Sequence, residues 1–354
     1  MHIVGYKIMK MTFRWYGLDD KNKLDYIRQI PNMSGVVTAL YSVPVGSVWP
    51  EEEIKALKEA VNAKGLEMEV IESVPVSEDI KLRSGNYKAH IEAFKENIRR
   101  LAKYGVKCIC YNFMPVFDWT RSELDHVNKD GSKSLVYYEE DVAKMDPTKL
   151  TLPGWDASYK PEEVADLINK YQALGEEGLW NNLKLFLEEI IPVARECDVL
   201  MAIHPDDPAW PIFGIPRLIT CEENVDRFLS LVDDHYNGLT FCTGSFGSSP
   251  KNDIVKMIDK YSKMDRIHFA HLRNVRQLGP HSFEEAAHYS ADGSLDMYQI
   301  CKALHKNGYN KYIRPDHGRM IWDEEAKPGY GLYDRALGAM YLSGIWEALD
   351  KENK

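Results

Sequence analysis

The chain has 354 residues, of which 28% are charged and 44% are hydrophobic, and its net charge is −10. This negative balance, without a dense run of lysine and arginine, argues against nucleic acid or an anionic membrane surface as a partner. No apolar stretch reaches the about 18 residues of a membrane span, and the N-terminus lacks the apolar core of a signal peptide. The six cysteines show no CxxC spacing, which is typical of a reducing compartment. We therefore expect a cytoplasmic protein.

Eight short segments rich in β-branched and aromatic residues predict strands. In chain order they are 11–16, 35–41, 66–72, 106–112, 199–204, 239–242, 267–271 and 312–316. Amphipathic stretches predict helices at 20–29, 51–64, 86–104, 179–196, 222–234, 251–263, 294–307 and 333–349. Strands that alternate with helices in this way indicate an α/β fold with a parallel sheet, and eight strands close into a (β/α)8 TIM barrel. Such a barrel accommodates residues 1–354 as a single domain.

Local signals mark where two of these helices begin. The acidic residues 51–53 follow Pro50, and their charges suit the positive N-terminal end of a helix. Ser248-Ser-Pro250 combines capping hydroxyls with a proline, so it predicts the start of the helix at 251–263.

One connection is much longer than the others. Residues 113–178 lie between the fourth strand and the next core helix, and they include a helix-like segment at 161–174. Their aromatic content argues against disorder, and a loop of this length in a compact domain is usually functional. Because the insertion follows the C-terminal end of a strand, we expect it to lie over the C-terminal face of the barrel as a lid. A contact between subunits is the alternative, and the two roles are compatible.

The last four predicted strands each end on a residue type that binds metal ions: His204, Cys242, His271 and Asp316. The C-terminal strand ends of a parallel barrel meet at one mouth. A borderline divalent cation accepts imidazole, thiolate and carboxylate ligands together. The sequence therefore predicts a divalent metal site at this mouth. His268 lies three residues before His271 and so points to the opposite side of the strand; we expect it to be a structural histidine.

Further polar side chains lie near the predicted strand ends and are expected to bind a small substrate. They are Arg14, Asn112, Asp118, Trp119, Arg121, His126, Ser245, Arg273 and Arg319. A guanidinium grips a carboxylate with two parallel hydrogen bonds, so the arginines favour an anionic substrate. Tyr330 lies between two glycines after the last strand. It is a candidate acid or base, and a tyrosine packed in a lid is the alternative.

Five segments carry a resemblance to a known family: Met11-Thr-Phe-Arg-Trp-Tyr-Gly17, Ala202-Ile-His-Pro-Asp-Asp-Pro208, Thr240-Phe-Cys-Thr-Gly-Ser245, His268-Phe-Ala-His-Leu-Arg-Asn274 and Ile313-Arg-Pro-Asp-His-Gly318. Together they resemble the mannonate dehydratase family, and the similarity spans essentially the whole chain. The resemblance implies a barrel of the xylose-isomerase-like group. It also implies dehydration of D-mannonate to 2-dehydro-3-deoxy-D-gluconate in hexuronate breakdown, with Mn²⁺ or Fe²⁺ as cofactor. The implied metal ligands are the four strand-end residues, and the implied proton-transfer residues are His317 and Tyr330, in an order that stays open.

Two other functions are alternatives to this one. A metal-dependent sugar isomerase or epimerase would use the same barrel, but such enzymes favour carboxylates and histidines, so the thiolate of Cys242 counts against it. A non-catalytic sugar-acid-binding protein would bind its ligand without turnover, and the acid and base groups around the metal count against that. In each case we expect a small sugar acid as the ligand, and the aromatic insertion and the barrel class favour a homo-oligomer.

Overall fold

The structure is a computed structural model, and it describes residues 9–150 and 160–352. Eight strands, each parallel to its neighbours, close into a barrel in the order β1-β12-β9-β8-β7-β4-β3-β2. Their bounds are β1 (Lys10–Arg14), β2 (Met33–Thr38), β3 (Glu67–Glu72), β4 (Cys108–Tyr111), β7 (Leu200–Ile203), β8 (Asn237–Cys242), β9 (Ile267–Leu272) and β12 (Tyr312–Pro315). Every strand predicted from the sequence overlaps one of these, so the TIM barrel is confirmed.

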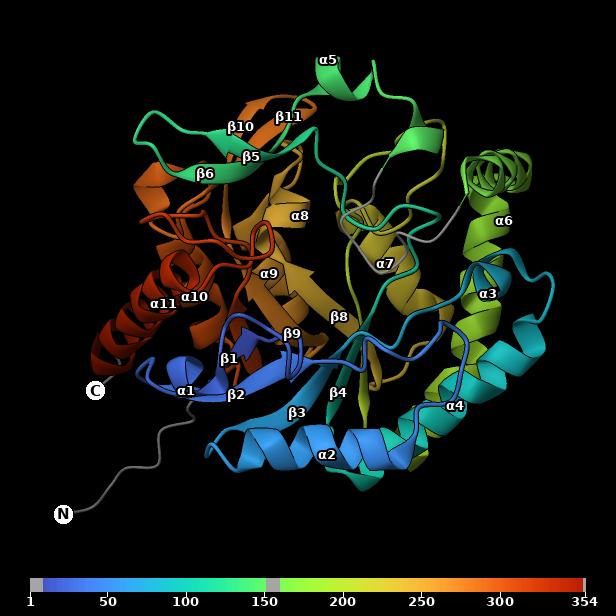
Figure 1. The fold of residues 1–354 in the computed structure, drawn as a ribbon, viewed down its shortest axis with the longest axis horizontal. Coiled ribbons are helices and arrows are strands. Elements are labelled where there is room, and N and C mark those ends of the chain that lie inside the picture. Colours follow the sequence, from blue (N-terminus) through green and yellow to red (C-terminus); the bar gives the residue numbers. More distant parts are fainter. Residues whose placement is uncertain (1–8, 151–159, 353–354) are drawn as a thin grey trace.

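Helices surround the barrel strands (Figure 1). The longer ones are α2 (Glu51–Asn62), α4 (Tyr87–Lys103), α6 (Pro161–Glu196), α7 (Glu222–Leu231), α9 (Ile254–Lys263), α10 (Met297–Lys306) and α11 (Tyr333–Glu352). The short ones are α1 (Leu24–Ile27), α3 (Glu78–Leu82), α5 (Glu139–Val142), α8 (Thr243–Gly247), and the 3₁₀ turns η1 (Pro147–Lys149) and η2 (Ser290–Asp292). The two helices predicted at 161–174 and 179–196 both lie in α6. They are separated by a kink at Gly175, whose φ of 68° is in the left-handed region that favours glycine.

Helix α9 begins later than the sequence predicts. The side chain of Asp253 accepts a hydrogen bond from the backbone N–H of Lys256 at 3.0 Å and caps the helix. Ser248 instead follows the short helix α8, and its hydroxyl donates to the carbonyl of Ser245 at 2.7 Å. The predicted helix start at Ser248-Ser-Pro250 is therefore wrong, because the Ser248 hydroxyl is hydrogen-bonded to the preceding helix α8 and does not cap α9.

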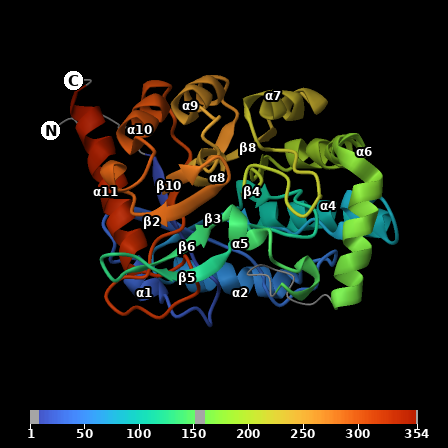
Figure 2. The same cartoon turned by 90° about the horizontal axis from the view of Figure 1, so that it is seen from above.

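A second sheet of four antiparallel strands, absent from the sequence prediction, lies beside the barrel (Figures 1 and 2). The insertion after β4 supplies β5 (Glu123–Val127) and β6 (Lys133–Tyr137), and the connection after β9 supplies β10 (Asn274–Gly279) and β11 (Ser282–Ala286). The two hairpins join through the β6–β11 pair. The sequence signal is weak because β5, with the sequence ELDHV, and β10, with NVRQLG, carry few apolar side chains. Residues 151–159 of the predicted lid lie outside the described residues.

The inside of the barrel is filled by its own small apolar cluster. It consists of Val37, Val70, Cys108, Cys110, Ala202, Phe269 and Tyr312. Phe269 lies two residues before His271, so both point to the same side of β9, and their rings are 4.4 Å apart. The cluster therefore forms an apolar floor under the strand ends. His268 is buried, and its Nε2 lies 2.8 Å from the carbonyl oxygen of His235, as expected of a structural histidine.

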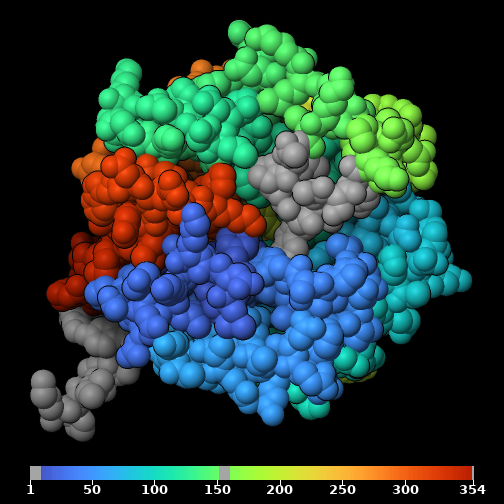
Figure 3. Space-filling view, in the orientation of Figure 1, coloured from blue at the N-terminus to red at the C-terminus, as the bar shows by residue number. Residues whose placement is uncertain are grey.

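On the molecular surface, the green atoms of the insertion lie above the red atoms of the C-terminal segment (Figure 3). Among the described residues, none of the helices combines the length and the apolar character needed to cross a membrane.

The capping role of Asp253 can be tested by replacing it with alanine. Loss of a side-chain cap costs about 1 kcal/mol of unfolding free energy, so Asp253→Ala should lower the urea denaturation midpoint. Ser249→Ala, in the segment where the sequence placed the helix start, is the control and should change the unfolding free energy by less than about 0.5 kcal/mol. A larger loss of stability in Ser249→Ala than in Asp253→Ala would show that the serine segment caps the helix instead.

Candidate active site

Three potential metal ligands converge at the C-terminal ends of the barrel strands. One ligand atom from each of His204, Cys242 and His271 lies within 4.8 Å of the other two. Parallel pairing of β8 with β9 places Cys242 beside His271. The Nδ1 atom of His204 is 2.7 Å from the carbonyl oxygen of Pro205, which leaves Nε2 available to a ligand. Imidazole and thiolate donors suit a borderline divalent cation.

Asp316, the fourth residue of the predicted set, lies beside this group. Its Oδ2 is 3.5 Å from the Cys242 sulfur, and its Oδ1 is 3.9 Å from His271 Nδ1. Arg314 and Arg273 contact its carboxylate at 2.6 and 2.9 Å. Burial would raise the pKa of Asp316, but Arg314 is the largest of several neighbouring groups that hold it well below its ordinary value. The carboxylate is therefore ionised, as a metal ligand must be.

A second donor group shares His271 and includes Glu72 and Cys110. Two arginines approach Glu72 Oε2, Arg314 at 3.0 Å and Arg14 at 3.3 Å, and their charges oppose a cation there. Burial also raises the pKa of the Cys110 thiol well above its ordinary value, so it stays neutral and is a poor ligand. The group of His204, Cys242 and His271 is the better candidate metal centre.

A cavity of about 250 Å³ opens next to the donor group. Its wall contains eight residues predicted for the site: Arg14, Asn112, Asp118, Trp119, His204, Asp316, His317 and Tyr330. Trp119, from the insertion after β4, packs against His317 with ring centroids 5.3 Å apart. The insertion thus supplies part of the wall that the barrel alone would leave open.

His317 and Tyr330 form a hydrogen-bonded pair in this cavity. The Tyr330 hydroxyl is 3.0 Å from His317 Nε2, and the Glu285 carboxylate is 3.1 Å from His317 Nδ1. An ionised carboxylate only accepts, so Nδ1 carries the proton and Nε2 accepts from the tyrosine. Burial raises the pKa of Tyr330 well above its ordinary value, which keeps the phenol protonated. The pair can therefore both accept and donate a proton.

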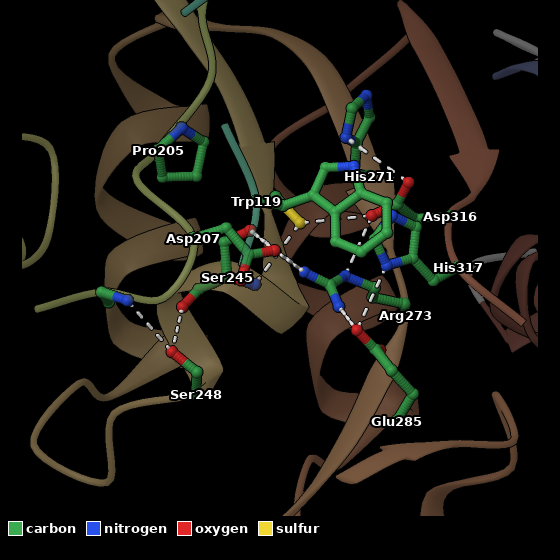
Figure 4. A network of polar contacts seen from close by, with 12 residues as sticks. Trp119, Pro205, Asp207, Ser245, Ser248, His271, Arg273, Glu285, Asp316 and His317 are labelled. Atoms are coloured by element: carbon green, nitrogen blue, oxygen red, sulfur yellow. Dashed lines mark hydrogen bonds and ion pairs between the residues drawn. The ribbon is translucent and has the colours of Figure 1, made fainter. Parts of the chain in front are cut away.

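Arg121 and Arg273, predicted to bind substrate, lie instead in a buried ionic network. Figure 4 shows Arg273 between Asp207 and Glu285. Arg121 contacts Asp207 at 2.7 Å and Glu285 at 2.6 Å, and Arg273 contacts Asp207 at 2.6 Å and also Glu285. Both arginine side chains are fully buried, and neither lines the cavity. The sequence reveals the two positive charges but not the carboxylates that neutralise them. Ser245 belongs to the same network, with its hydroxyl 3.2 Å from Asp207.

Two other residues predicted to bind substrate do not line the cavity. His126 lies on β5, where its Nδ1 is 3.2 Å from Glu123. Arg319 forms ion pairs with Asp334 at 3.0 Å and Asp130 at 3.1 Å. Both follow strand ends in the sequence, but His126 is part of the second sheet and Arg319 is part of the loop before α11, so neither side chain reaches the cavity.

Four charged residues of the cavity wall are missing from the predicted set: Glu72, Asp207, Arg314 and Lys327. Arg314 lies two residues before Asp316, so the strand period alone places both on the same side of β12. Glu72 is the last residue of β3, so its position at a strand end could also be predicted from the sequence. Lys327 lies in the loop before α11, with its ammonium 4.0 Å from the centre of the Tyr16 ring. No periodicity in the sequence indicates that loop position.

These features define a barrel enzyme with a candidate metal centre and a cavity for a small polar molecule. Comparison with known proteins makes the assignment specific: the family model of D-mannonate dehydratase (UxuA) matches residues 9–354. The chain belongs to this family. It is therefore a hydro-lyase that dehydrates mannonate, and the family implies a metal ion.

Individual proteins agree with the family assignment. Mannonate dehydratase 2 of Halalkalibacterium halodurans is 52% identical over 343 residues, which is 96% of this chain and 99% of the relative. The crystal structure of mannonate dehydratase from Streptococcus suis serotype 2 matches with a TM-score of 0.92 and 49% identity, covering 98% of this chain and 96% of that one. A D-tagatose 3-epimerase-like protein matches with a TM-score of 0.55 and 11% identity, covering 98% of this chain and all of that one, which indicates a shared fold alone.

The ionic network should make stability depend on pH. Burial would raise the pKa of Glu285, but Arg273 and Arg121 lower it from 4.5 to about 2. A carboxylate with a lowered pKa stabilises the folded state above its unfolded pKa, and this stabilisation is lost as the pH falls toward the folded value. The urea denaturation midpoint should therefore fall between about pH 5 and pH 3.

Glu285→Gln cannot be protonated and should flatten part of this decline. Glu284→Gln is the matched control in the same strand, where Glu284 pairs with the partly exposed Arg276 at 2.9 Å. That variant should keep the wild-type slope. An equally steep decline in Glu285→Gln would show that Glu285 does not carry the acid sensitivity.

Proposed function

We propose that dehydration of D-mannonate to 2-dehydro-3-deoxy-D-gluconate takes place in this cavity, with Mn²⁺ or Fe²⁺ held by His204, Cys242, His271 and Asp316. One observation carries the proposal: the donor group and the hydrogen-bonded pair of His317 and Tyr330 lie at the same mouth. The donor set fits a metal because Asp316 is ionised and His204 Nε2 is available. When bound, a divalent cation acts as a Lewis acid that stabilises negative charge on the substrate.

Arg14 is the best-placed group for the substrate carboxylate. Its side chain is 4% exposed and lies 3.3 Å from Glu72. Among the described residues, its Nε has no hydrogen-bond partner, and its Nη1 makes the ion pair with Glu72 without a hydrogen bond of good geometry. Buried donors without partners are costly, and a carboxylate in the cavity would supply the missing acceptors. Arg314 and Lys327 also line the cavity and add further positive charge.

His317 is proposed as the base and Tyr330 as the acid. His317 Nε2 takes the proton from C2, which is weakly acidic because it lies next to the carboxylate. Tyr330 donates its hydroxyl proton to the C3 hydroxyl, which leaves as water and gives an enol that tautomerises to the 2-keto acid. The positive charge formed on His317 is 3.0 Å from the phenol and favours its deprotonation. The proton on Nε2 then passes to the tyrosine oxygen and restores both groups.

The insertion and the second sheet are proposed to exclude water from the mouth during this reaction. Asp118 and Trp119 are the parts of the insertion that line the cavity. A small sugar acid is the expected ligand, and we propose that the active protein is a cytoplasmic homo-oligomer without nucleic acid as a partner.

Turnover distinguishes the function from its two alternatives. Incubation of the metal-loaded protein with D-mannonate should yield a product lighter by one water, detected by mass spectrometry. A product of unchanged mass would support an isomerase or epimerase. Binding without any product would support a sugar-acid-binding protein.

Replacing the thiolate should weaken the metal site. Cys242→Ser should lower metal affinity by more than roughly tenfold, since even changes to outer-shell groups cost that much. Metal bound per chain is measured by elemental analysis after gel filtration. Cys110→Ser, which alters another buried thiol inside the barrel, is the matched control and should keep its metal. Full metal content in Cys242→Ser would contradict the ligand set.

Removing the Tyr330 hydroxyl should impair proton transfer alone. Tyr330→Phe should lower kcat by roughly 10²- to 10⁴-fold, the usual contribution of a general acid or base, with metal content unchanged. Tyr333→Phe removes a hydroxyl from a tyrosine that is 43% exposed and should leave kcat as in the wild type. Near-normal turnover of Tyr330→Phe would exclude it as the acid.

A further inference from the structure

Glu72 faces a proposed metal ligand from the opposite side of the barrel. It ends β3, which is separated from β9 by several strands in either direction around the ring. Its Oε2 lies 3.3 Å from Nε2 of His271. This contact is within ion-pair distance, and neither atom has a hydrogen bond of good geometry among the described residues. Oε2 of Glu72 also contacts Arg314 at 3.0 Å and Arg14 at 3.3 Å, so it is the buried Nε2 of His271 that needs Glu72 as a polar partner.

The other ring nitrogen of His271 indicates where the proton lies. Nδ1 is 3.5 Å from Nη2 of Arg314, and a guanidinium only donates. Nδ1 therefore offers its lone pair, and the proton of the neutral ring is on Nε2, toward Glu72. The same Nδ1 faces Asp316 Oδ1 at 3.9 Å. The lone pair of His271 thus points to the side of the ring where the other proposed ligands lie.

Glu72 is ionised in these surroundings. Burial would raise its pKa, but Arg314, His271 and Arg14 hold it well below its ordinary value. A carboxylate that accepts the N–H of a metal-binding histidine fixes the ring orientation and its tautomer, and it makes the other nitrogen a stronger ligand. The two arginines that keep Glu72 ionised also disfavour a cation on Glu72 itself.

We propose that Glu72 is a positioning residue for the metal centre: it accepts the Nε2 proton of His271 and directs Nδ1 toward the metal. This inference rests on the metal site of the proposed function. It assigns to β3 a role in metal binding although β3 supplies none of the proposed ligands. Arg314 contacts both Glu72 and Asp316, at 3.0 and 2.6 Å. It therefore fixes the position of the Glu72 carboxylate relative to Asp316, the fourth proposed ligand.

The test is the metal affinity of Glu72→Gln, measured by calorimetric titration of the metal-free protein with Mn²⁺. The amide cannot accept from both arginines and the histidine as the carboxylate does, so we expect a roughly 10- to 100-fold higher Kd. Glu69→Gln is the matched control. Glu69 is on the same strand and also reaches β12, with its carboxylate 3.1 Å from the Tyr312 hydroxyl. It touches none of the proposed ligands, and its Kd should equal that of the wild type.

A spectroscopic measurement separates positioning from general damage. Co²⁺ in Glu72→Gln should keep a thiolate-to-metal absorption band from Cys242 while it binds more weakly. If Glu72→Gln does not fold, Glu72→Asp carries the test, because it keeps a negative charge near the arginines and withdraws it from His271. A wild-type Mn²⁺ Kd in the folded variant would overturn the proposal, as would a rise in KM for mannonate alone.

Failure of the metal site itself is distinguishable from failure of this proposal. If Cys242→Ser binds Mn²⁺ as tightly as the wild type, the proposed ligand set is wrong. If Cys242→Ser loses affinity and Glu72→Gln does not, the ligand set stands and the role of Glu72 falls.

Discussion

Closure of the parallel barrel is the constraint on which the remaining structure depends. β1 pairs with both β2 and β12, so the eight strands form a ring without a free edge. Because all strands run in one direction, their C-terminal ends meet at one mouth. Within this ring, parallel pairing of the neighbouring strands β7, β8 and β9 brings His204, Cys242 and His271 within 4.8 Å of one another, although they are 67 positions apart from first to last (271 − 204).

Buried charge is organised around that mouth in two connected groups. Glu72, Arg14 and Arg314 lie on one side of Asp316, and the network of Arg121, Asp207, Arg273 and Glu285 lies on the other. Each buried carboxylate has an arginine partner, which offsets the cost of removing it from water. The consequence is a cavity where ionised groups keep fixed positions, as a reaction that develops negative charge on its substrate requires.

The second sheet gives the insertion a structural role that the sequence did not indicate. The sequence suggests a lid, but the hairpin of β5 and β6 pairs with β11, and β11 carries Glu285. Glu285 contacts His317, Arg121 and Arg273. The elements added to the barrel therefore line part of the cavity, through Asp118 and Trp119, and also supply the carboxylate that selects the tautomer of His317. The short, polar strands gave no sequence signal for this, because their alternation is too weak to be separated from loop.

The sequence by itself determined the barrel, the strand ends and the family. Eight alternating units specify a closed parallel sheet. Strand period separates His268 from His271, and the place of His271 at the C-terminal end of the strand favours it as the ligand, because both signals are local. Tertiary structure alone decided which charged side chains can reach a substrate in the cavity. Arg121 and Arg273 look like substrate ligands until Asp207 and Glu285 are seen to neutralise them away from the cavity, whereas Arg14 lines the cavity. The partner of a buried charge is fixed by packing between distant segments, which no local pattern encodes.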